Sequence, residues 1–203
     1  EIAKRQPTIA AAAPLVADPI VRVRGTFVGS VCHADPQGDW AATMIALNGS
    51  IVVQGPKGKR TIAMKDFVLG PYANSLNYNE IAIEAVIPAP KGVARGGYLK
   101  LERRVGDFAT ASVAVALDMN GDTVLGAGFA LAGVGGKTID ANEAASALIG
   151  QKLTEATIAK AAALVAAKAE PRTDHRGSAE YKRHIIETFV KRILVANSAQ
   201  KVA

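Results

Sequence analysis

Two long apolar runs joined by an Asn-Gly pair constrain this chain more than any other feature. Residues 109–117 and 124–131 consist mainly of Ala, Val, Leu and Phe, and Asn120-Gly121 lies between them. Asn-Gly suits the left-handed backbone of a tight two-residue hairpin turn. Paired strands of this kind must bury an apolar face, so the sequence predicts a small antiparallel sheet in the second half of the chain.

The segments after this hairpin are predicted to be helical. Asp140 and Glu143 stand at capping-box spacing, and Thr154 is a good N-cap residue. A long amphipathic stripe marks the last helix. The predicted elements of this half are strands over 98–103, 109–117 and 124–131, and helices over 140–148, 154–168 and 178–197. Together they form a three-stranded antiparallel sheet followed by three helices, an α+β arrangement.

The first ninety residues mix helix, loop and strand. A helix is expected to end before Asp18-Pro19, because the residue before a proline is disfavoured in the helical region. The elements expected after it are an extended stretch over 20–24, a glycine-containing loop over 25–39, a helix over 40–47, a hairpin of 51–53 with 60–64, a loop over 66–72 and a strand over 80–87. Residues 88–97, rich in Pro and Gly, are the expected linker between the halves.

Composition excludes several classes of protein. The net charge of +6 is spread along the chain without a basic run interleaved with aromatics, so a nucleic-acid partner is not expected. A single cysteine, Cys32, excludes an internal disulfide and a multi-cysteine metal site, and favours the cytoplasm. No apolar run approaches the ~20 residues of a transmembrane helix.

The segment from Thr26 to Asp39 is the best candidate for a binding site. Glycine lets a ligand approach the backbone, and Thr26 and Ser30 add hydroxyls beside it. These groups suit a pyrophosphate or a flavin edge, and Asp39 suits a ribose hydroxyl. Taken alone, such a segment is more often an ordinary tight turn. Ser30, His33 and Asp35 imitate a hydrolase triad, but the chain has no G-x-S-x-G nucleophile elbow.

Several motifs occur in a fixed order along nearly the whole chain. They are Asp18-Pro19 with Arg22 to Gly25, Thr26 to Ser30, Phe67 to Gly70, Glu80-Ile81 with Ile87-Pro88, Tyr98 to Lys100 with Arg103-Arg104 and Asp107 to Ala109, and Pro171, Asp174, Arg176, Ser178, Ala179 and Tyr181. In this order the chain resembles the FAD-binding medium subunits of the molybdenum hydroxylases, the group that includes aerobic carbon monoxide dehydrogenase and xanthine dehydrogenase.

The resemblance implies an oxidoreductase subunit that holds FAD and passes electrons from an iron–sulfur subunit to an external acceptor. Molybdopterin and [2Fe-2S] clusters belong to partners, a large molybdopterin-binding subunit and a small iron–sulfur subunit, in a dimer of heterotrimers. The complex is expected in the cytoplasm, with association to the inner face of the membrane left open. Residues 1–90 correspond to an FAD-binding lobe without the N-terminal part of its module, and residues 91–203 to the flavoprotein C-terminal domain.

The family's FAD contacts transfer to seven positions. They are Thr26, Gly29, Ser30, His33, Asp39, Ala82 and Lys100. Lys100 is expected beside the flavin ring, where its charge would stabilise the anionic reduced form. Val28 stands where the family has the first glycine of a pair, and its branched side chain is expected to crowd a glycine-type backbone.

Two other functions compete with the flavin hypothesis. One is a scaffold that docks partner subunits without holding flavin, which Val28 and the missing part of the module favour. The other is an FAD-dependent alcohol oxidase of the vanillyl-oxidase type. It requires a substrate pocket and catalytic residues on this chain, and the sequence offers none.

Overall fold

The computed structural model describes residues 2–198; Glu1 and residues 199–203, which the domain ranges above include, lie outside them. The centre of the molecule is an antiparallel sheet of strands β6 (Val93–Leu101), β7 (Ala111–Asn120), β8 (Thr123–Ala132) and β9 (Ile139–Asp140), in that order. The predicted hairpin is confirmed, with Asn120 paired to Thr123 and Gly121 at φ 56°. The short strand β9 is an addition to the three strands expected.

Each face of this sheet carries its own core. Along β7, Val113, Val115 and Leu117 face one cluster, which includes helices α7 (Glu155–Ala167) and α8 (Ala179–Asn197). Small alternate residues of β7 and β8 face the other cluster, namely Ala114, Ala116, Gly128, Ala130 and Ala132, with the buried Ser112 on the same face. Both faces are therefore buried, and the two strands read as continuous apolar runs instead of alternating ones.

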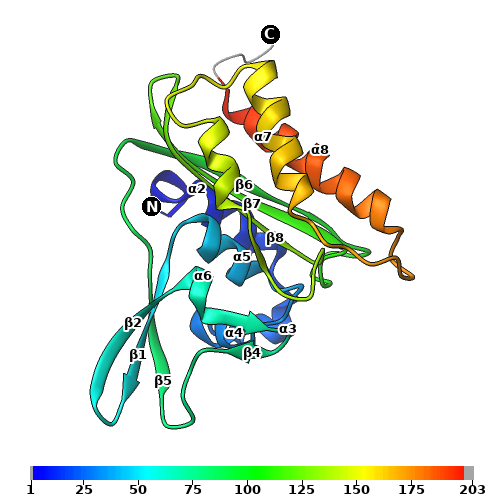
Figure 1. Cartoon of the computed structure of the whole chain (residues 1–203). Coiled ribbons are helices and arrows are strands. Elements are labelled where there is room, and N and C mark those ends of the chain that lie inside the picture. The colour runs from blue at the N-terminus through cyan, green and yellow to red at the C-terminus, as the bar shows by residue number, and fades with distance from the viewer. Residues whose placement is uncertain (1, 199–203) are drawn as a thin grey trace.

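The face with the small residues is covered by helices from the start of the chain. Figure 1 shows α7 and α8 on one side of the large sheet and α2 (Pro7–Ala12) and α5 (Asp39–Ala46) on the other. Small side chains let these helices approach the strands closely. Thr8 of α2 donates to the carbonyl oxygen of Val115 at 2.8 Å, and a Cβ on Gly128 would lie 1.9 Å from the carbonyl oxygen of Ala46.

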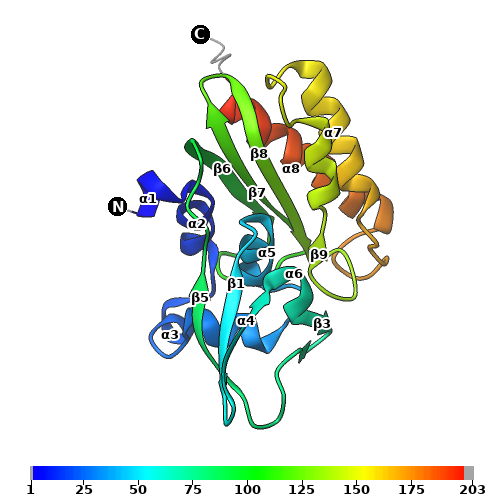
Figure 2. The ribbon, with the colours of Figure 1, turned by 60° about the vertical axis from the view of Figure 1, so that its left-hand side comes forward.

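The rest of the N-terminal half consists of short helices and strands. Its helices are α1 (Ile2–Arg5), the 3-10 turn η1 (Ala13–Leu15), α3 (Pro19–Arg22), α4 (Phe27–His33) and α6 (Met64–Phe67), and its strands are β1 (Ser50–Gly55), β2 (Gly58–Ala63), β3 (Val68–Gly70), β4 (Ala73–Asn74) and β5 (Ile81–Val86). Strands β2, β1 and β5 form an antiparallel sheet that projects from the body, as Figure 2 shows.

Most predicted elements are confirmed, with five differences. The stretch 20–24 is not extended, because Asp18 caps the short helix α3 by accepting from the N–H of Val21 at 3.0 Å. The loop over 25–39 contains α4. The loop over 66–72 holds the end of α6 and strand β3. The linker over 88–97 already enters β6 at Val93. The helix over 140–148 is the 3-10 helix η2 (Asn142–Ala147), in which Asp140 accepts from the N–H of Asn142 and no side chain caps the end.

An ion pair ties β5 to the hairpin of β1 and β2. Arg60 donates to the Glu80 carboxylate from Nε and from Nη2, each at 2.7 Å, and Glu80 also accepts from the N–H of Asn77. These bonds, the Arg60 bond first among them, lower the pKa of Glu80 from 4.5 to about 2.

This ion pair gives a pH-dependent prediction. A carboxylate with a lowered pKa stabilises the fold above its unfolded-state pKa, and that contribution is lost as pH falls from about 4.5 to about 2. Glu80→Gln should therefore lower the unfolding temperature at pH 7, and its difference from the wild type should vanish near pH 2. Thermal unfolding followed by circular dichroism measures this. Glu84→Gln on the same strand is the control, and an equal loss there would contradict the assignment.

Candidate functional site

Helix α4 carries four of the seven predicted site residues. Thr26 is its N-cap, and its Oγ1 accepts from the N–H of Gly29 at 3.1 Å. Gly29 and Ser30 lie in the first turns and His33 is the last helical residue. Thr26, Gly29, Ser30 and His33 are all exposed. The segment is thus a capped helix whose first turn points N–H groups at solvent.

The backbone around Val28 differs from the expectation. The predicted crowding at Val28 is wrong, because this residue lies inside α4 and does not have a positive φ. A helical backbone accepts a branched side chain at small cost. The residue that cannot carry a side chain is Gly29. A Cβ at this position would lie 2.7 Å from Oγ1 of Thr26 and would displace the capping hydroxyl.

The carboxyl end of α4 adjoins an aromatic side chain. The His33 ring lies 5.2 Å from the ring of Tyr72, and its Nε2 is 3.9 Å from Asp35. Tyr72 has a left-handed backbone, and its N–H donates to the carbonyl oxygen of Ala34. Ala82 of β5 is partly buried and packs against the same core as α4. His33 and Tyr72 therefore form an exposed polar and aromatic pair at the end of α4.

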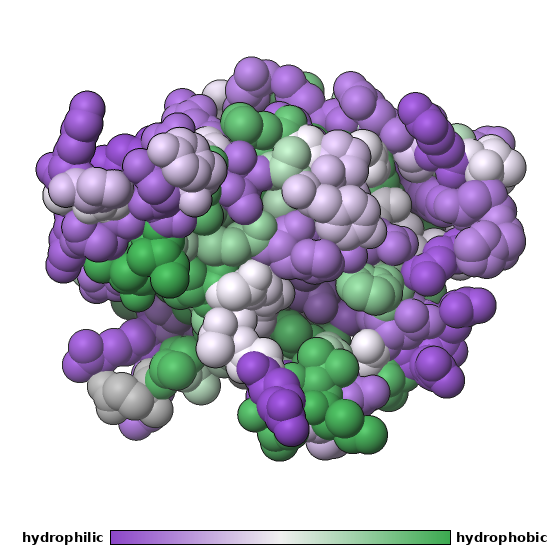
Figure 3. All heavy atoms as spheres, turned by 90° about the horizontal axis from the view of Figure 1, so that it is seen from below, coloured by the Kyte–Doolittle hydropathy of each residue, from purple (hydrophilic) through white to green (hydrophobic). Residues whose placement is uncertain are grey.

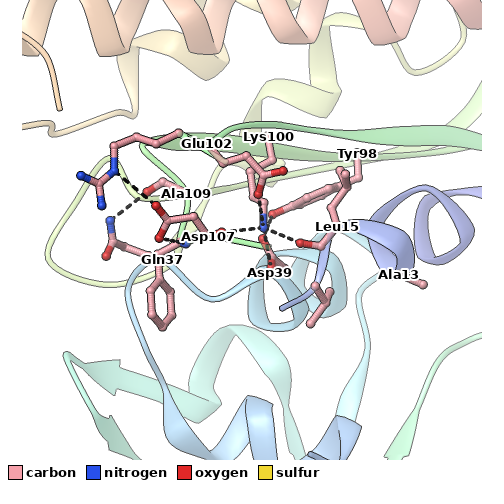
Figure 4. A network of polar contacts seen from close by, with 12 residues as sticks. Ala13, Leu15, Gln37, Asp39, Tyr98, Lys100, Glu102, Asp107 and Ala109 are labelled. Carbon is pink, nitrogen blue, oxygen red and sulfur yellow. Dashed lines mark hydrogen bonds and ion pairs between the residues drawn. The ribbon is translucent and has the colours of Figure 1, made fainter. Parts of the chain in front are cut away.

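Lys100 and Asp39 meet in a buried ion pair between the large sheet and α5. Lys100 Nζ donates to Asp39 Oδ2 at 3.2 Å and lies 3.1 Å from Glu102 Oε2. The hydroxyl of Tyr98 donates to Asp39 Oδ1 at 2.5 Å. The Lys100 side chain is only 1% exposed. Figure 4 shows Tyr98 and Lys100 of β6, and Glu102 just after this strand, gathered around the Lys100 ammonium group beside Asp39.

Two backbone carbonyls complete the shell around this ammonium group. Lys100 Nζ donates to Leu15 O at 2.6 Å and to Asp107 O at 3.0 Å. The contacts reach η1, α5 and the loop after β6, which are segments far apart in sequence. We call this set of residues, Leu15, Asp39, Tyr98, Lys100, Glu102 and Asp107, the Lys100 network.

The electrostatics of the Lys100 network follow from burial. Desolvation raises the pKa of Asp39, while the bonds from Tyr98 and Lys100 oppose that rise. Burial, and then the nearby Asp39 carboxylate, raise the pKa of Tyr98 well above its usual value. Glu102 Oε2 is buried and makes no hydrogen bond, although it is paired with Lys100 by charge. One cation thus faces two carboxylates.

The structure divides six of the seven predicted site residues into two sets, and the seventh, Ala82, lies on β5. Those on α4 are exposed, whereas Asp39 and Lys100 belong to the buried network. Sequence reasoning missed Tyr98 and Glu102, although Tyr98 and Lys100 alternate along β6 and therefore share a face, and Glu102 follows the end of the strand in the same alternation. Two surface pockets of about 280 and 470 Å³ are lined by other residues.

Neither a metal cluster nor a membrane span is found in the part of the chain that the structure describes. No group of three or more His, Cys, Asp and Glu side chains within residues 2–198 has the arrangement to hold a metal ion. Over the same residues, no helix combines the length and the hydrophobicity of a membrane-spanning segment.

Comparison with known proteins defines the class. Residues 1–90 match the FAD binding domain in molybdopterin dehydrogenase, and residues 97–196 match the CO dehydrogenase flavoprotein C-terminal domain. The fold superimposes on carbon monoxide dehydrogenase from Hydrogenophaga pseudoflava with a TM-score of 0.90 and 39% identity, covering 96% of this chain and 68% of that one. Quinoline 2-oxidoreductase from Pseudomonas putida gives a TM-score of 0.85 at 30% identity, over 96% of this chain and 68% of that one. Fold and sequence therefore define a flavoprotein-type subunit.

Sequence identity to individual relatives assigns the chain to one family within this class of flavoprotein subunits. The chain is 38% identical to the carbon monoxide dehydrogenase medium chain of Hydrogenophaga pseudoflava, over 95% of this chain and 67% of the relative. It is 35% identical to the nicotine 6-hydroxylase medium subunit of Paenarthrobacter nicotinovorans, over 98% of this chain and 70% of the relative. The chain belongs to the family of FAD-binding medium subunits of the molybdenum hydroxylases, which are oxidoreductases. It spans about two thirds of the length of these relatives.

Proposed function

We propose that this chain binds FAD as the electron-relay subunit of a molybdenum-dependent dehydrogenase. The observation that carries the proposal is the exposed, Thr26-capped start of α4 in a chain of this family. When bound, FAD supplies the electron transfer between an iron–sulfur partner and an external acceptor, while the protein binds and orients it.

The first turn of α4 would hold the phosphate-bearing part of the cofactor. Unpaired N–H groups and the positive end of the helix dipole favour an anion there. Gly29 keeps the capping hydroxyl in place, since a Cβ at this position would collide with Thr26. The Ser30 hydroxyl and the His33 ring add exposed polar groups along the same helix.

The Lys100 network would support the flavin ring from the protein side. Glu102 Oε2 lies 3.1 Å from Lys100 Nζ and places a second negative charge beside the ammonium group. Lys100 is held by Asp39 and by two carbonyl oxygens, which fixes the position of its charge. Asp39 and Lys100 would thus act from within the Lys100 network. The backbone around Ala82 would flank the ring from β5.

The same proposal covers domains and partners. Residues 1–90 form the FAD-binding part, and residues 91–203 form the C-terminal flavoprotein domain. The matches of the two family models to residues 1–90 and 97–196 support this division. The names of the relatives as medium chains support a larger and a smaller partner subunit. The same proposal makes these a molybdopterin-binding and an iron–sulfur subunit, in a dimer of heterotrimers. We place the complex in the cytoplasm, where association with the inner face of the membrane would come from a partner.

Removing the cap of α4 tests the cofactor site. Thr26→Ala deletes the hydroxyl that accepts from Gly29, which should cost about 1 kcal/mol of stability and loosen the first turn. If FAD phosphates bind that turn, the dissociation constant of FAD should rise by about threefold to tenfold. Fluorescence titration of FAD into the deflavinated assembly measures this constant.

A matched cap elsewhere separates binding from stability. Ser178 caps α8 in the same way, accepting from the N–H of Tyr181 at 3.1 Å. Ser178→Ala should cause a similar loss of stability and leave the FAD constant unchanged. Equal FAD constants for Thr26→Ala and the wild type would reject α4 as the phosphate site.

A further inference from the structure

The loop between β6 and β7 supplies one side of the Lys100 network. We call residues 102–110 the β6–β7 loop. Its Asp107 carbonyl oxygen accepts from Lys100 Nζ at 3.0 Å, and its Ala109 carbonyl oxygen accepts from Gln37 Nε2 at 2.8 Å. Figure 4 shows Asp107 and Leu15 on opposite sides of the Lys100 ammonium group. The position of this group therefore depends on how the loop is held.

Apolar packing does little to hold the tip of the β6–β7 loop. None of residues 103–108 is buried, and Val105 and Phe108 are 82% and 51% exposed. Exposed apolar groups also lie between hydrophilic ones on the face of the molecule shown in Figure 3. A segment with few buried apolar contacts opens easily unless polar contacts hold it.

Arg176 makes such contacts with two consecutive residues of the loop. Its Nη1 donates to the Phe108 carbonyl oxygen at 2.9 Å, and its Nη2 lies 3.9 Å from Asp107 Oδ1. The Arg176 side chain is 13% exposed. The planar guanidinium group carries several donors in a fixed geometry, so one side chain can hold a carbonyl oxygen and a carboxylate together. Arg176 thus holds the backbone whose Asp107 carbonyl contacts Lys100.

The charge of Arg176 is the smaller part of this contribution. Asp107 has a second cation nearby, because Arg103 Nε lies 3.3 Å from its Oδ2. Among the groups that lower the pKa of Asp107, the N–H of Phe108 comes first, Arg103 follows and Arg176 comes last. What distinguishes Arg176 from Arg103 is therefore its bond to the backbone of Phe108.

The turn that carries Arg176 is fixed to α8. Asp174 and Gly177 exchange two backbone hydrogen bonds of 3.1 Å, and Asp174 Oδ1 accepts from the N–H of Arg176 at 2.8 Å. Asp174 Oδ2 lies 2.7 Å from Nζ of Lys182, a residue of α8 whose side chain is only 4% exposed. Helix α8 packs on one face of the large sheet and α5 on the other, as Figure 1 shows. Arg176 therefore connects a turn fixed on one face to the Lys100 network on the other.

We propose that Arg176 is a positioning residue, which keeps the Asp107 carbonyl oxygen on the Lys100 ammonium group and thereby fixes the charge of Lys100. The inference rests on the proposed function, since this charge matters to the reaction only if flavin binds to this chain. Without Arg176, the tip of the loop moves away and the ammonium group loses one acceptor. A cation that is held less firmly stabilises the reduced flavin less.

The accessibility of Lys100 tests the positioning without any cofactor. The assembly is deflavinated and treated with an amine-acetylating reagent, and the rate of labelling of each lysine is measured by mass spectrometry. In Arg176→Gln, Lys100, which is 1% exposed in the wild type, should be labelled at least about tenfold faster because the loop opens locally. Lys182 is the internal control and should keep its wild-type rate. A wild-type rate at Lys100, or an equal increase at both lysines, would overturn the proposal.

Two further arginine substitutions separate position from charge. Arg183→Gln removes a cation of α8 that donates to the carbonyl oxygen of Ala169 at 3.4 Å, away from the loop. Arg103→Gln removes the other cation beside Asp107 and keeps the Phe108 bond. Both variants should leave the labelling of Lys100 at the wild-type rate. Labelling in Arg103→Gln as fast as in Arg176→Gln would assign the effect to charge and overturn the positioning role.

The midpoint potential of bound FAD tests the consequence for the reaction. In Arg176→Gln the equilibrium constant for flavin reduction should fall by about tenfold, which lowers the potential by about 30 mV for a two-electron couple. Arg176→Lys keeps one donor for Phe108 and should recover part of this shift, and Arg183→Gln should show none. A lower stability alone would not move the potential of the flavin that remains bound. Redox titration of the loaded assembly, followed by absorption, gives the values.

The two measurements distinguish this inference from the proposed function. Faster labelling of Lys100 with an unchanged potential would overturn the role of Arg176 toward the flavin and leave FAD binding intact. A wild-type assembly without FAD would overturn the proposed function and this role together, whereas the labelling rates would still show whether Arg176 holds Lys100 in place.

Discussion

Lys100→Met is expected to lower the free energy of unfolding by about 3–5 kcal/mol, the cost of leaving buried charge without its partner. Among the described residues 2–198, Lys100 is the only cation paired with both Asp39 and Glu102, and the substitution removes it. It also leaves the carbonyl oxygens of Leu15 and Asp107 without their donor. Urea denaturation of the purified chain at pH 7 measures the loss.

The loss should depend on pH. Burial already raises the pKa of Asp39, and Lys100 opposes that rise, so removing Lys100 raises this pKa further. A carboxyl group with a raised folded-state pKa stabilises the fold at low pH and loses that contribution as pH rises through the raised pKa. The difference between the variant and the wild type should therefore shrink from pH 7 to pH 5.

A second variant checks that unbalanced charge causes the effect. Asp39→Asn keeps an acceptor for Tyr98 and leaves Lys100 paired with Glu102. Its cost should be smaller, about 1–2 kcal/mol. The double variant Lys100→Met with Asp39→Asn should recover part of the loss of Lys100→Met alone. A loss below about 1 kcal/mol for Lys100→Met, compared with the 3–5 kcal/mol expected, would show that the network does not join the two parts of the fold.

Gly128→Ala is expected to cost about 3 kcal/mol, at the upper end of overpacking effects, and to lower the unfolding temperature by about 6–12 °C. The new methyl group would lie 1.9 Å from the carbonyl oxygen of Ala46, so α5 must move away from β8. That movement also strains the contact in which Asn142 donates to Ile45 O and accepts from the N–H of Phe129. Differential scanning calorimetry measures the shift.

Gly126 provides the matched control. It stands two residues earlier on the same strand and face, and a Cβ there would meet the Cβ of Asp118 at an ordinary 3.6 Å. Gly126→Ala should be neutral or slightly stabilising, because alanine restricts the unfolded chain more than glycine does. Equal losses for the two variants would contradict the close approach of α5 as the cause.

The large sheet and its helices could be predicted because their signals are local. Asn120-Gly121 specifies the turn, and the apolar runs on either side of it indicate two paired strands. Thr154 caps α7 with a capping box completed by Thr157, and Ser178 caps α8. In each case the residues that make the element are neighbours in sequence.

The helices around the candidate site were harder to predict. Helices α3 and α4 have four and seven residues, which is too short for an apolar period to show. Their caps, Asp18 and Thr26, were present in the sequence and were interpreted as loop residues. The available signal was an N-cap residue at each helix start, Asp18 before Pro19 and Thr26 before Phe27.

The Lys100 network could not be predicted from the sequence, for a different reason. Its members come from positions 15, 39, 98, 100, 102 and 107, so only the packing of α5 against the sheet brings them together. The resemblance supplied Asp39 and Lys100 as separate contacts, without showing that they pair. Because the Lys100 side chain is only 1% exposed, we propose that it acts from within the Lys100 network and not as a side chain that touches the flavin ring.

The absorption spectrum of the assembly isolated with its own partners tests the central claim most directly. The chain is purified with a tag from its native host, and flavin absorption in the blue is compared with protein content. The account predicts about one FAD per chain, bleached when the substrate of the complex is added and restored by air or another acceptor. An intact assembly with all its partners but no flavin absorption would contradict the account and leave the chain as a scaffold.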